Sequence, residues 1–545
     1  RNQTAGLGAS LSWSHGSHTF QAGGDIRRQQ FNTIGQEDPR GSFGFTAAAT
    51  ATSAGGTGSD LAGFLFGIPD TARIAYGNAD KYLRAGMYDA YVNDDWHTRP
   101  GLTVNAGLRW EYASPITELY GRLVNLDVAP AFAAASAVVA NSPAGTTTGT
   151  RYPSSLMQPD RLGLQPRIGI AWRPVPASSL LVRAGYGVYY DTSVYQAIAS
   201  RMTQQPPLST SFSVQNSAVN PLTLENGFRK PHLTTANTFA VDPHVQVGYS
   251  QTWQAKIQRD MPGALVLSAG YLGTKGTRAQ QQFLPNTYPA GKASPCPSCP
   301  TGFIYLTSNG NSTRHAAQVQ LRRRLHRGWL AALDYTFAKA IDNASLGGRG
   351  EGTAVMAQDW LNLRGERGLS NFDQRHLLTL QSQYTAGMGT LGGILTRGWR
   401  GVALRNWTIS NNLKLDSGLP LTPVYSRVVQ GTGVIGSIRP SYTGAPLYDA
   451  PAGLHLNPFA LTVPADGQWG NAGRNSISGP AQFAFDTSLS RSFRDGRLEV
   501  RADAQNLLNH VVYKKWNTSI TSTQFGLPTA ADSMRTLRIT MRVRF

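Results

Sequence analysis

Disulfide bonds cannot be the framework of this chain, because only two of its 545 residues are cysteines. Cys296 and Cys299 stand close together in the sequence CPSC, inside a proline-rich stretch. This spacing favours a local disulfide in an oxidising compartment. Half of a zinc site is the weaker interpretation, since no second cysteine pair exists to complete it.

Long apolar runs are absent as well. The longest, Val128 to Ala140, is broken by Pro130 and Ser136, whereas a membrane-spanning helix needs about 20 predominantly apolar residues. We therefore expect no transmembrane helix. A transmembrane β-barrel remains possible, because barrel strands alternate apolar and polar side chains and form no long apolar run.

Acidic residues are scarce relative to basic ones. The chain has 31 Asp and Glu against 50 Lys and Arg, which gives a net charge of +19. Such a balance suits nucleic acid, an anionic membrane surface or an anionic ligand. The densest basic cluster, Arg322 to Arg324, belongs to no helix-turn-helix, zinc-finger or RNA-recognition pattern. We expect no nucleic-acid partner, and the charge points instead to an anionic membrane surface or an anionic substrate.

The C-terminal segment shows what the chain has instead. Within the last twelve residues, Met534 to Phe545, apolar and polar residues alternate without a break from Leu537 onward, so that a β-strand here has one apolar and one cationic face. The apolar face consists of Leu537, Ile539, Met541, Val543 and Phe545. A strand that ends the chain on its own aromatic residue resembles the closing strand of an outer-membrane β-barrel.

The same alternation recurs along the whole chain and predicts fifteen strands. Besides the terminal strand, they are Leu7–Trp13, His18–Arg28, Leu83–Trp96, Leu102–Tyr112, Pro166–Trp172, Leu180–Tyr190, Val245–Gln258, Ala264–Tyr271, Arg314–Leu325, Trp329–Ile341, Asp373–Tyr384, Val402–Leu415, Gln482–Phe493 and Leu498–Leu507. The sequence therefore predicts an all-β fold.

The connections between these strands alternate in length. Short turns such as SHGS, HTRPG, DMPG and HRG follow the odd-numbered strands, except for the long link Ala386 to Gly401. Long loops follow the even-numbered strands: Phe31–Lys81, Ala113–Gln165, Thr192–His244, Gly276–Ser312, Asp342–Phe372 and Asn509–Ser533. This asymmetry is typical of a transmembrane antiparallel β-barrel. Since such barrels have an even strand number, we expect further strands outside this chain.

Aromatic residues lie near the ends of the predicted strands. They are Trp96, Trp110, Tyr112, Trp172, Tyr190, Tyr271, Trp329, Phe337 and Phe545. An interfacial girdle would explain them, because such rings favour the headgroup layer. The general preference of aromatic residues for strands explains them equally well.

Several phrases of the sequence resemble TonB-dependent outer-membrane receptors, particularly the Oar-like group. In chain order these are YVNDDWHTRPGLTVNAGLRWEY from Tyr91, PRIGIAWRP from Pro166, LVRAGYGVYYD from Leu181, WTISNNLKLDSGLPLTP from Trp407, GNAGRNSISGP from Gly470, FDTSLSRSF from Phe485, LEVRADAQNLLNH from Leu498 and the terminal LRITMRVRF. The resemblance implies a plugged barrel of 22 strands, of which residues 1–545 would supply the C-terminal fifteen.

The resemblance also implies partners and a location. The expected location is the outer membrane of a Gram-negative type of cell, in contact with its lipid and lipopolysaccharide. The terminal strand would be read by the barrel-assembly machinery. TonB and its inner-membrane energising complex would act through an N-terminal region. The plug, TonB box, regulatory-like domain and signal peptide of such receptors have no counterpart in this sequence.

Motifs for catalysis were weighed and set aside. Gly431 to Gly436 matches the dinucleotide pattern GxGxxG, but Pro440 blocks the helix that this motif requires. The carboxylates Asp94, Asp95, Glu111, Asp416 and Asp503 could form an acid/base pair. They are better explained as ion-pairing groups inside a barrel, beside Arg109, Lys414 and Arg501. We expect no enzymatic activity, no cofactor and no metal site.

The long loops are the expected place for ligand capture. Their aromatic residues Tyr305, Trp360, Trp469 and Trp516 are candidates for contacting an unknown ligand, although packing between loops would account for them as well. Two other functions remain open. One is a structural or adhesive surface barrel without transport, and the other is a secreted soluble β-rich enzyme.

Overall fold

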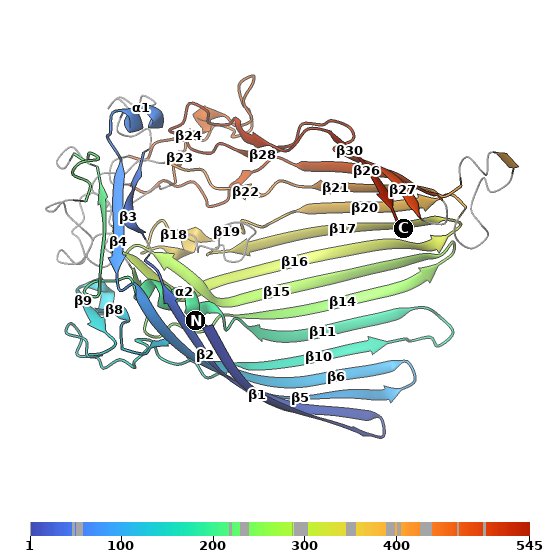
Figure 1. Cartoon of the computed structure of the whole chain (residues 1–545), viewed down its shortest axis with the longest axis horizontal. Helices are drawn as coiled ribbons and strands as arrows, with labels where there is room; N and C mark the ends of the chain where they lie inside the picture. The colour runs from blue at the N-terminus through green and yellow to red at the C-terminus, as the bar shows by residue number, and fades with distance from the viewer. Residues whose placement is uncertain are drawn as a thin grey trace.

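Fifteen long antiparallel strands form the body of the molecule (Figure 1). The computed structural model describes residues 2–36, 38–45, 50, 58–216, 221–228, 239–285, 287, 303–344, 356–387, 398–399, 405–425, 439–465, 468–493 and 497–544. The long strands are β1 (Asn2–His15), β2 (His18–Ile34), β5 (Asp80–Arg99), β6 (Leu102–Ala113), β10 (Leu164–Trp172), β11 (Leu181–Tyr190), β14 (Tyr249–Met261), β15 (Leu265–Phe283), β16 (Ile304–His326), β17 (Trp329–Asp342), β20 (His376–Thr385), β21 (Trp407–Asp416), β26 (Gln482–Phe493), β27 (Leu498–Gln505) and β30 (Thr536–Val543).

Each long strand pairs with the next long strand in chain order. The predicted all-β fold and the fifteen predicted strands are thus confirmed. Short strands, among them β7 (Thr117–Glu118) and β13 (Phe239–Val241), add to the loop end of the same sheet.

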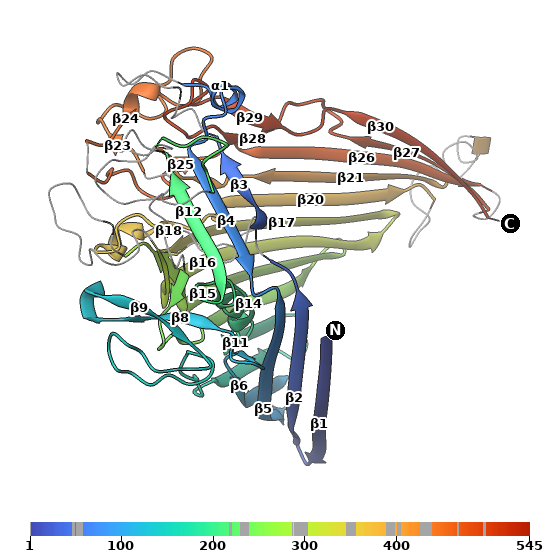
Figure 2. The same cartoon turned by 60° about the vertical axis from the view of Figure 1, so that its left-hand side comes forward.

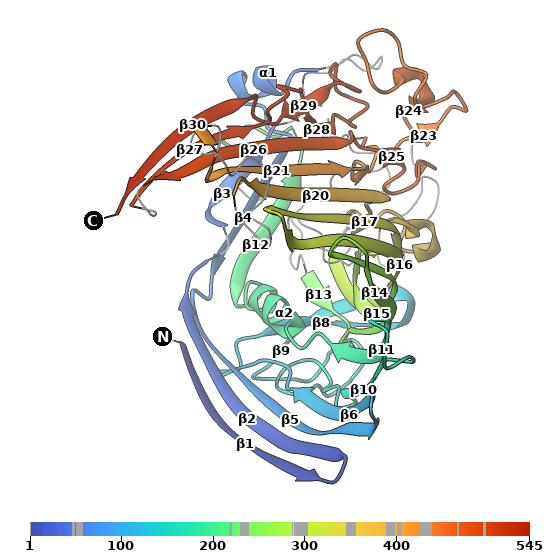
Figure 3. The same cartoon turned by 90° about the vertical axis from the view of Figure 1, so that its right-hand side faces the viewer.

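The sheet curls into a trough. Figure 3 shows its two edge strands, β1 and β30, on the same side of the molecule, with the other strands curving around between them. Within the described residues, β1 pairs only with β2 and β30 only with β27. Both edges therefore present unpaired backbone groups, a feature that proteins normally cover.

The two faces of the sheet differ in polarity because the side-chain period of a strand is two. Leu108 of β6 lies opposite Val92 of β5, whereas the adjacent Arg109 lies opposite Tyr91. Apolar side chains of the convex face are widely exposed, as in Leu108 (45%), Ile168 (49%) and Leu489 (43%). Such an exposed apolar surface is expected where a barrel meets lipid.

The connections separate by length as the sequence predicts. Turns such as residues 16–17 and 327–328 join strands at one end, which we call the short-turn end, and the long connections lie at the other, the loop end. Several strands run further into the loop end than expected, most of all β15 and β16. β15 continues to Phe283 and β16 begins at Ile304, so much of the predicted loop Gly276–Ser312 is strand.

The loops fold into a layer of their own. β3 (Asp38–Gly44), β4 (Thr71–Gly77) and β12 (Ser209–Gln215) form a three-stranded sheet, which crosses the long strands at the loop end (Figure 2). β8 (Val124–Val128) and β9 (Ala135–Val139) form a hairpin near α2 (Val194–Met202). Their hydrophobic core includes Leu123, Met157 and Met202, all fully buried. The hydrophobic core of this molecule therefore lies mainly in its loops.

Among the described residues, no helix is long and apolar enough to cross a membrane.

Candidate functional site: the concave wall and the loop layer

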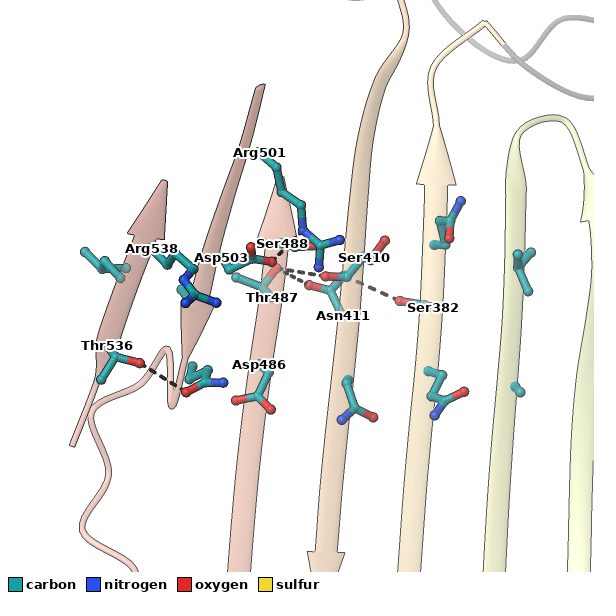
Figure 4. A pocket seen from close by; sticks show the side chains of 18 residues that line it. Ser382, Ser410, Asn411, Asp486, Thr487, Ser488, Arg501, Asp503, Thr536 and Arg538 are labelled. Atoms are coloured by element: carbon teal, nitrogen blue, oxygen red, sulfur yellow. Dashed lines mark hydrogen bonds and ion pairs between the residues drawn. The ribbon is translucent and has the colours of Figure 1, made fainter. Parts of the chain in front are cut away.

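A polar recess opens on the concave face between β17 and β30 (Figure 4). Its volume is about 1090 Å³. Side chains of the lumen-facing strand face form most of its lining, because alternate residues of paired strands point the same way. They include Gln381, Gln383, Ser410, Asn412, Asp486, Ser488, Arg501, Asp503, Gln505 and Arg538. The recess thus offers amides, hydroxyls, two carboxylates and two guanidiniums to whatever occupies the lumen.

Ion pairs along this wall join residues two apart on the same strand. Nε of Arg501 lies 2.7 Å from Oδ1 of Asp503, and Nζ of Lys414 lies 2.7 Å from Oδ2 of Asp416. On β6, Nε of Arg109 lies 3.3 Å from Oε2 of Glu111. The predicted lumenal ion pairs are confirmed for these three carboxylates.

Asp94 lies on the other face of the sheet. It is opposite Phe20 and Ala106 on the convex side, and its Oδ2 lies 2.8 Å from Nδ1 of His18. The His18 ring stacks on Phe20 and on Trp96, with centroid distances of 5.5 and 5.3 Å. Its neighbour Asp95 points into the lumen and accepts a hydrogen bond from Asn105. Asp94 and Asp95 therefore lie on opposite faces of the sheet and cannot act together as an acid/base pair.

Aromatic rings near the strand ends lie on the convex face. Trp172 pairs with Leu102 and Val182, and Trp329 pairs with Tyr384, all on the apolar side. Arginines accompany some of these rings. The guanidinium of Arg323 lies 4.5 Å from the ring centroid of Trp329 at the short-turn end. Rings and cations at this position match an interfacial girdle, where both reach the headgroup layer.

The terminal strand keeps its predicted alternation. Leu537, Ile539 and Met541 are 74%, 80% and 68% exposed, and Val543 shares their face. They lie opposite Ala504, Ala502 and Val500 of β27 on the convex side. Phe545 lies outside the described residues. The role of this strand as an assembly signal stays a prediction.

Two carboxylates are buried in the loop layer and satisfied there. Asp127 accepts hydrogen bonds from the hydroxyls of Thr148 and Tyr152 at 2.6 and 2.7 Å, and from the backbone N–H groups of Thr147 and Thr148, both at 2.8 Å. Burial alone would raise the pKa of this carboxyl, but the hydrogen bonds outweigh it and hold the pKa below its usual range. Glu118 behaves alike. Burial opposes its ionisation, yet contacts from Arg122 and from backbone N–H groups lower its pKa.

Two arginines, Arg474 buried and Arg439 partly buried, join the distal loops to the segment around Glu366, and Arg474 also joins them to the sheet. Arg439 binds the Glu366 carboxylate through both terminal nitrogens, at 2.8 and 2.9 Å. Arg474, in the phrase GNAGRNSISGP, donates from Nε to the carbonyl of Glu366 at 2.9 Å and from Nη2 to Asp342 at the end of β17. The phrase was quoted above for its resemblance, but nothing in the sequence indicated that its arginine is buried.

The candidate ligand aromatics are distributed over three places. Tyr305 is 8% exposed, and its ring lies 5.0 Å from that of Phe132. Trp360 lies 5.3 Å from Phe132 and donates to the carbonyl of Thr287. Trp469 packs beside Leu284 and Tyr425, and Trp516 stacks on His455 at 4.0 Å. The structure thus brings Tyr305 and Trp360 together around Phe132 and leaves the other two apart. Their role toward a ligand stays a prediction.

Cys296 and Cys299 lie outside the described residues, as does the glycine motif at 431–436. Across the ranges given above, no group of three or more His, Cys, Asp or Glu side chains gathers in a way that could hold a metal ion.

A curved antiparallel sheet with an apolar convex face, a polar concave face and loops segregated by length defines a β-barrel protein of the outer membrane. The chain belongs to the outer membrane beta barrel domain family, whose model matches residues 1–539.

The chain is also similar to solved structures of outer-membrane proteins. The chain is similar to the outer membrane transporter YddB from Escherichia coli, with 12% sequence identity and a TM-score of 0.52, over 100% of this chain and 54% of YddB. It is also similar to the ferripyoverdine receptor of Pseudomonas aeruginosa, with 11% identity and a TM-score of 0.48, over 99% of this chain and 48% of the receptor. The chain therefore spans about half the length of these proteins, and the likeness to YddB shows the fold alone. No curated protein sequence matches the chain.

Proposed function

We propose that this chain forms the barrel wall of a TonB-dependent outer-membrane receptor of the Oar-like group. Its loops capture a ligand at the cell surface, and the ligand then passes through the lumen. TonB and its inner-membrane complex supply the energy for this passage. The observation that carries the proposal is the polar recess on the concave wall, at about 1090 Å³. A recess of this volume leaves room on the lumenal wall behind the loops for a plug or a passing solute.

The proposal includes strands and a plug that are not part of this chain. The open edges of β1 and β30 support it, because each has a pairing partner on one side only among the described residues. A complete outer-membrane barrel leaves no edge unpaired. In the 22-stranded architecture of outer-membrane transporters, the preceding strands would join these two edges and a plug would rest against the polar wall.

The proposed partners follow from the same reasoning. TonB and its energising complex would pull on the N-terminal region from the periplasm. The barrel-assembly machinery would read the terminal strand, and the convex face would contact outer-membrane lipid and lipopolysaccharide.

The proposal is tested by binding of the full-length protein, folded in detergent, to the purified periplasmic domain of TonB. We expect saturable binding that is lost when the N-terminal region before the barrel is deleted. Heat-modifiable gel mobility of both proteins provides the folding control. A folded full-length barrel without affinity for TonB would overturn the proposal and favour a structural or adhesive barrel.

A further inference from the structure

A second part of the concave wall, on β10, β11 and β14, carries cations without acidic partners. The lumen-facing residues from β6 to β15 form three rows, as the strand pairings show. Each row crosses the strands β6, β10, β11, β14 and β15 in that order. The row nearest the loop end is Gly107, Arg167, Gly187, Thr252 and Thr274. The middle row is Asn105, Gly169, Gly185, Gln254 and Leu272, and the row nearest the short-turn end is Thr103, Ala171, Arg183, Lys256 and Gly270. These positions include three cations, five glycines and no carboxylate.

Arg183 and Lys256 lie directly opposite each other on neighbouring strands. Like charges in directly opposed positions destabilise a sheet. Both side chains are exposed to the lumen, and neither makes an ion pair with any residue in the described ranges. An arrangement that costs folding free energy, and that no partner among the described residues relieves, is expected where an anion from outside these residues supplies the missing charge.

The third cation is held in place by an aromatic ring. The guanidinium of Arg167 lies 4.7 Å from the ring centroid of Tyr189, and its Nη2 donates to Oε1 of Gln165 at 3.2 Å. The carboxylates on the neighbouring parts of the wall are already engaged. Asp95 accepts from Asn105, and Glu111 receives both Arg109 and Gln165. Asp334, which lines a recess together with Lys256, accepts a hydrogen bond from Gln320.

The floor beside Arg183 and Lys256 is glycine. Gly169 and Gly185 are paired with each other at the centre of the rows. Neither has a positive φ, and a Cβ added to either would meet no atom closer than 3.4 Å. Neither backbone strain nor crowding therefore requires glycine here. The absence of two side chains instead leaves room above the backbone, a hollow bordered by Arg183 and Lys256, with the amide of Gln254 beside it. Arg167 is turned away from this hollow, toward Gln165 and Tyr189.

We propose that this glycine-floored hollow is an anion subsite of the lumen, which binds a phosphate or carboxylate group of the transported solute. The guanidinium of Arg183 and the ammonium of Lys256 supply charge-assisted donors, and a guanidinium binds either oxyanion with paired N–H groups. Arg183 is the third residue of β11, next to the turn at residues 174–180. The subsite therefore lies in the short-turn half of the wall, where a solute arrives after it has passed the loops.

This inference rests on the proposed passage of a solute through the lumen, and it states that the solute carries a phosphate or carboxylate group. The test measures binding of inorganic pyrophosphate and of citrate to the full-length protein, folded in detergent at low salt, by isothermal titration calorimetry. We expect at least one of the two anions to bind, and added sodium chloride to weaken it. Binding of pyrophosphate alone identifies a phosphate site, and binding of citrate alone a carboxylate site.

Three variants locate the site. The double variant R183Q/K256Q should weaken binding at least tenfold, and so should G169V, which fills the hollow but keeps both cations. R27Q, which removes a lumenal arginine of β2 that pairs with Asp25, should leave the dissociation constant within twofold of the wild type. Heat-modifiable mobility confirms that each variant is folded. Failure of both anions to bind the wild type, equal binding by R183Q/K256Q or G169V, or an equal loss in R27Q would overturn the subsite.

The two proposals fail separately. A full-length protein that binds TonB but neither anion loses the subsite and keeps the receptor function. A protein that binds an anion at this hollow but ignores TonB loses the receptor function and keeps the subsite.

Discussion

Arg474 and Asp342 form an ion pair that is almost completely removed from solvent. Nη2 of Arg474 lies 2.5 Å from Oδ1 of Asp342 and 2.6 Å from its carbonyl oxygen, and the two side chains are 1% and 3% exposed. Asp342 ends β17, while Arg474 belongs to a loop more than one hundred residues later in the chain. The pair therefore fastens a distal loop to the rim of the barrel.

Replacing Arg474 by lysine should loosen this fastening. Lysine cannot reach Asp342 and the carbonyl of Glu366 together, so the variant leaves a buried charge incompletely paired, which costs about 3–5 kcal/mol. We expect faster hydrogen exchange in residues 356–387 and 468–480, with unchanged exchange in β10 and β11. The control is Arg324→Gln. Its pair with Asp260 is exposed, so the loss should be below about 1 kcal/mol. Equal exchange in Arg474→Lys and wild type would contradict the fastening role.

Leu413 and Asn412 of β21 provide a matched test of the two faces of the wall. Leu413 pairs with Leu380 and Phe485 on the convex side, and Asn412 pairs with Gln381 and Asp486 in the lumen. An arginine at a lipid-facing position near the middle of a barrel strand costs about 2–4 kcal/mol. In urea unfolding from lipid vesicles, we expect Leu413→Arg to lower the free energy of unfolding by this amount and Asn412→Arg to lower it only slightly. A larger loss in Asn412→Arg would reverse the assignment of the faces.

The strands could be predicted from the sequence because their signal is local. In β6 and β30 the alternation of apolar and polar residues specifies both the strand and its two faces. Turn length, also a local property, indicated which ends meet the loops. The positions of the strand ends were predicted less accurately than the strands themselves. β15 and β16 continue past Gly276 and Ser312 because they pair with each other beyond the barrel wall, and this pairing leaves little trace in the polar sequence of either strand.

The contacts within the loop layer and the anion subsite could not be predicted, because they join residues that are distant in the chain. Asp127 is a lone aspartate until Thr148 and Tyr152 fold around it, and Arg474 resembles any loop arginine. The hollow at Gly169 depends on the register that places Gly185 opposite it and Arg183 opposite Lys256. The alternation that predicts a strand repeats along a single segment of the sequence. The residues of a site come from several strands, and only the register between those strands brings them together.

The predicted bridge between Cys296 and Cys299 is tested by alkylation of the unreduced protein. In a local disulfide, both thiols resist iodoacetamide until a reductant is added, and the peptide is then two hydrogens heavier before labelling. Cys296→Ser leaves one free thiol that reacts at once and serves as the control. Immediate double labelling of the protein from the oxidising compartment would show that no bridge forms.

Asp127 should make the stability of the loop layer depend on pH. Its pKa is lowered in the folded state, so its contribution is complete above the unfolded value of about 3.9 and is lost as the pH falls through the lower folded value. Asp127→Asn cannot accept all four hydrogen bonds, and we expect it to cost about 1–3 kcal/mol at pH 7. The difference in unfolding free energy between wild type and Asp127→Asn, from urea titrations followed by near-ultraviolet circular dichroism, should shrink below pH 4. Asp449→Asn alters an exposed loop carboxylate and should follow the wild-type profile. A difference that stays constant from pH 7 to pH 3 would mean that the charge of Asp127 does not stabilise the fold, and that its hydrogen bonds act through geometry alone.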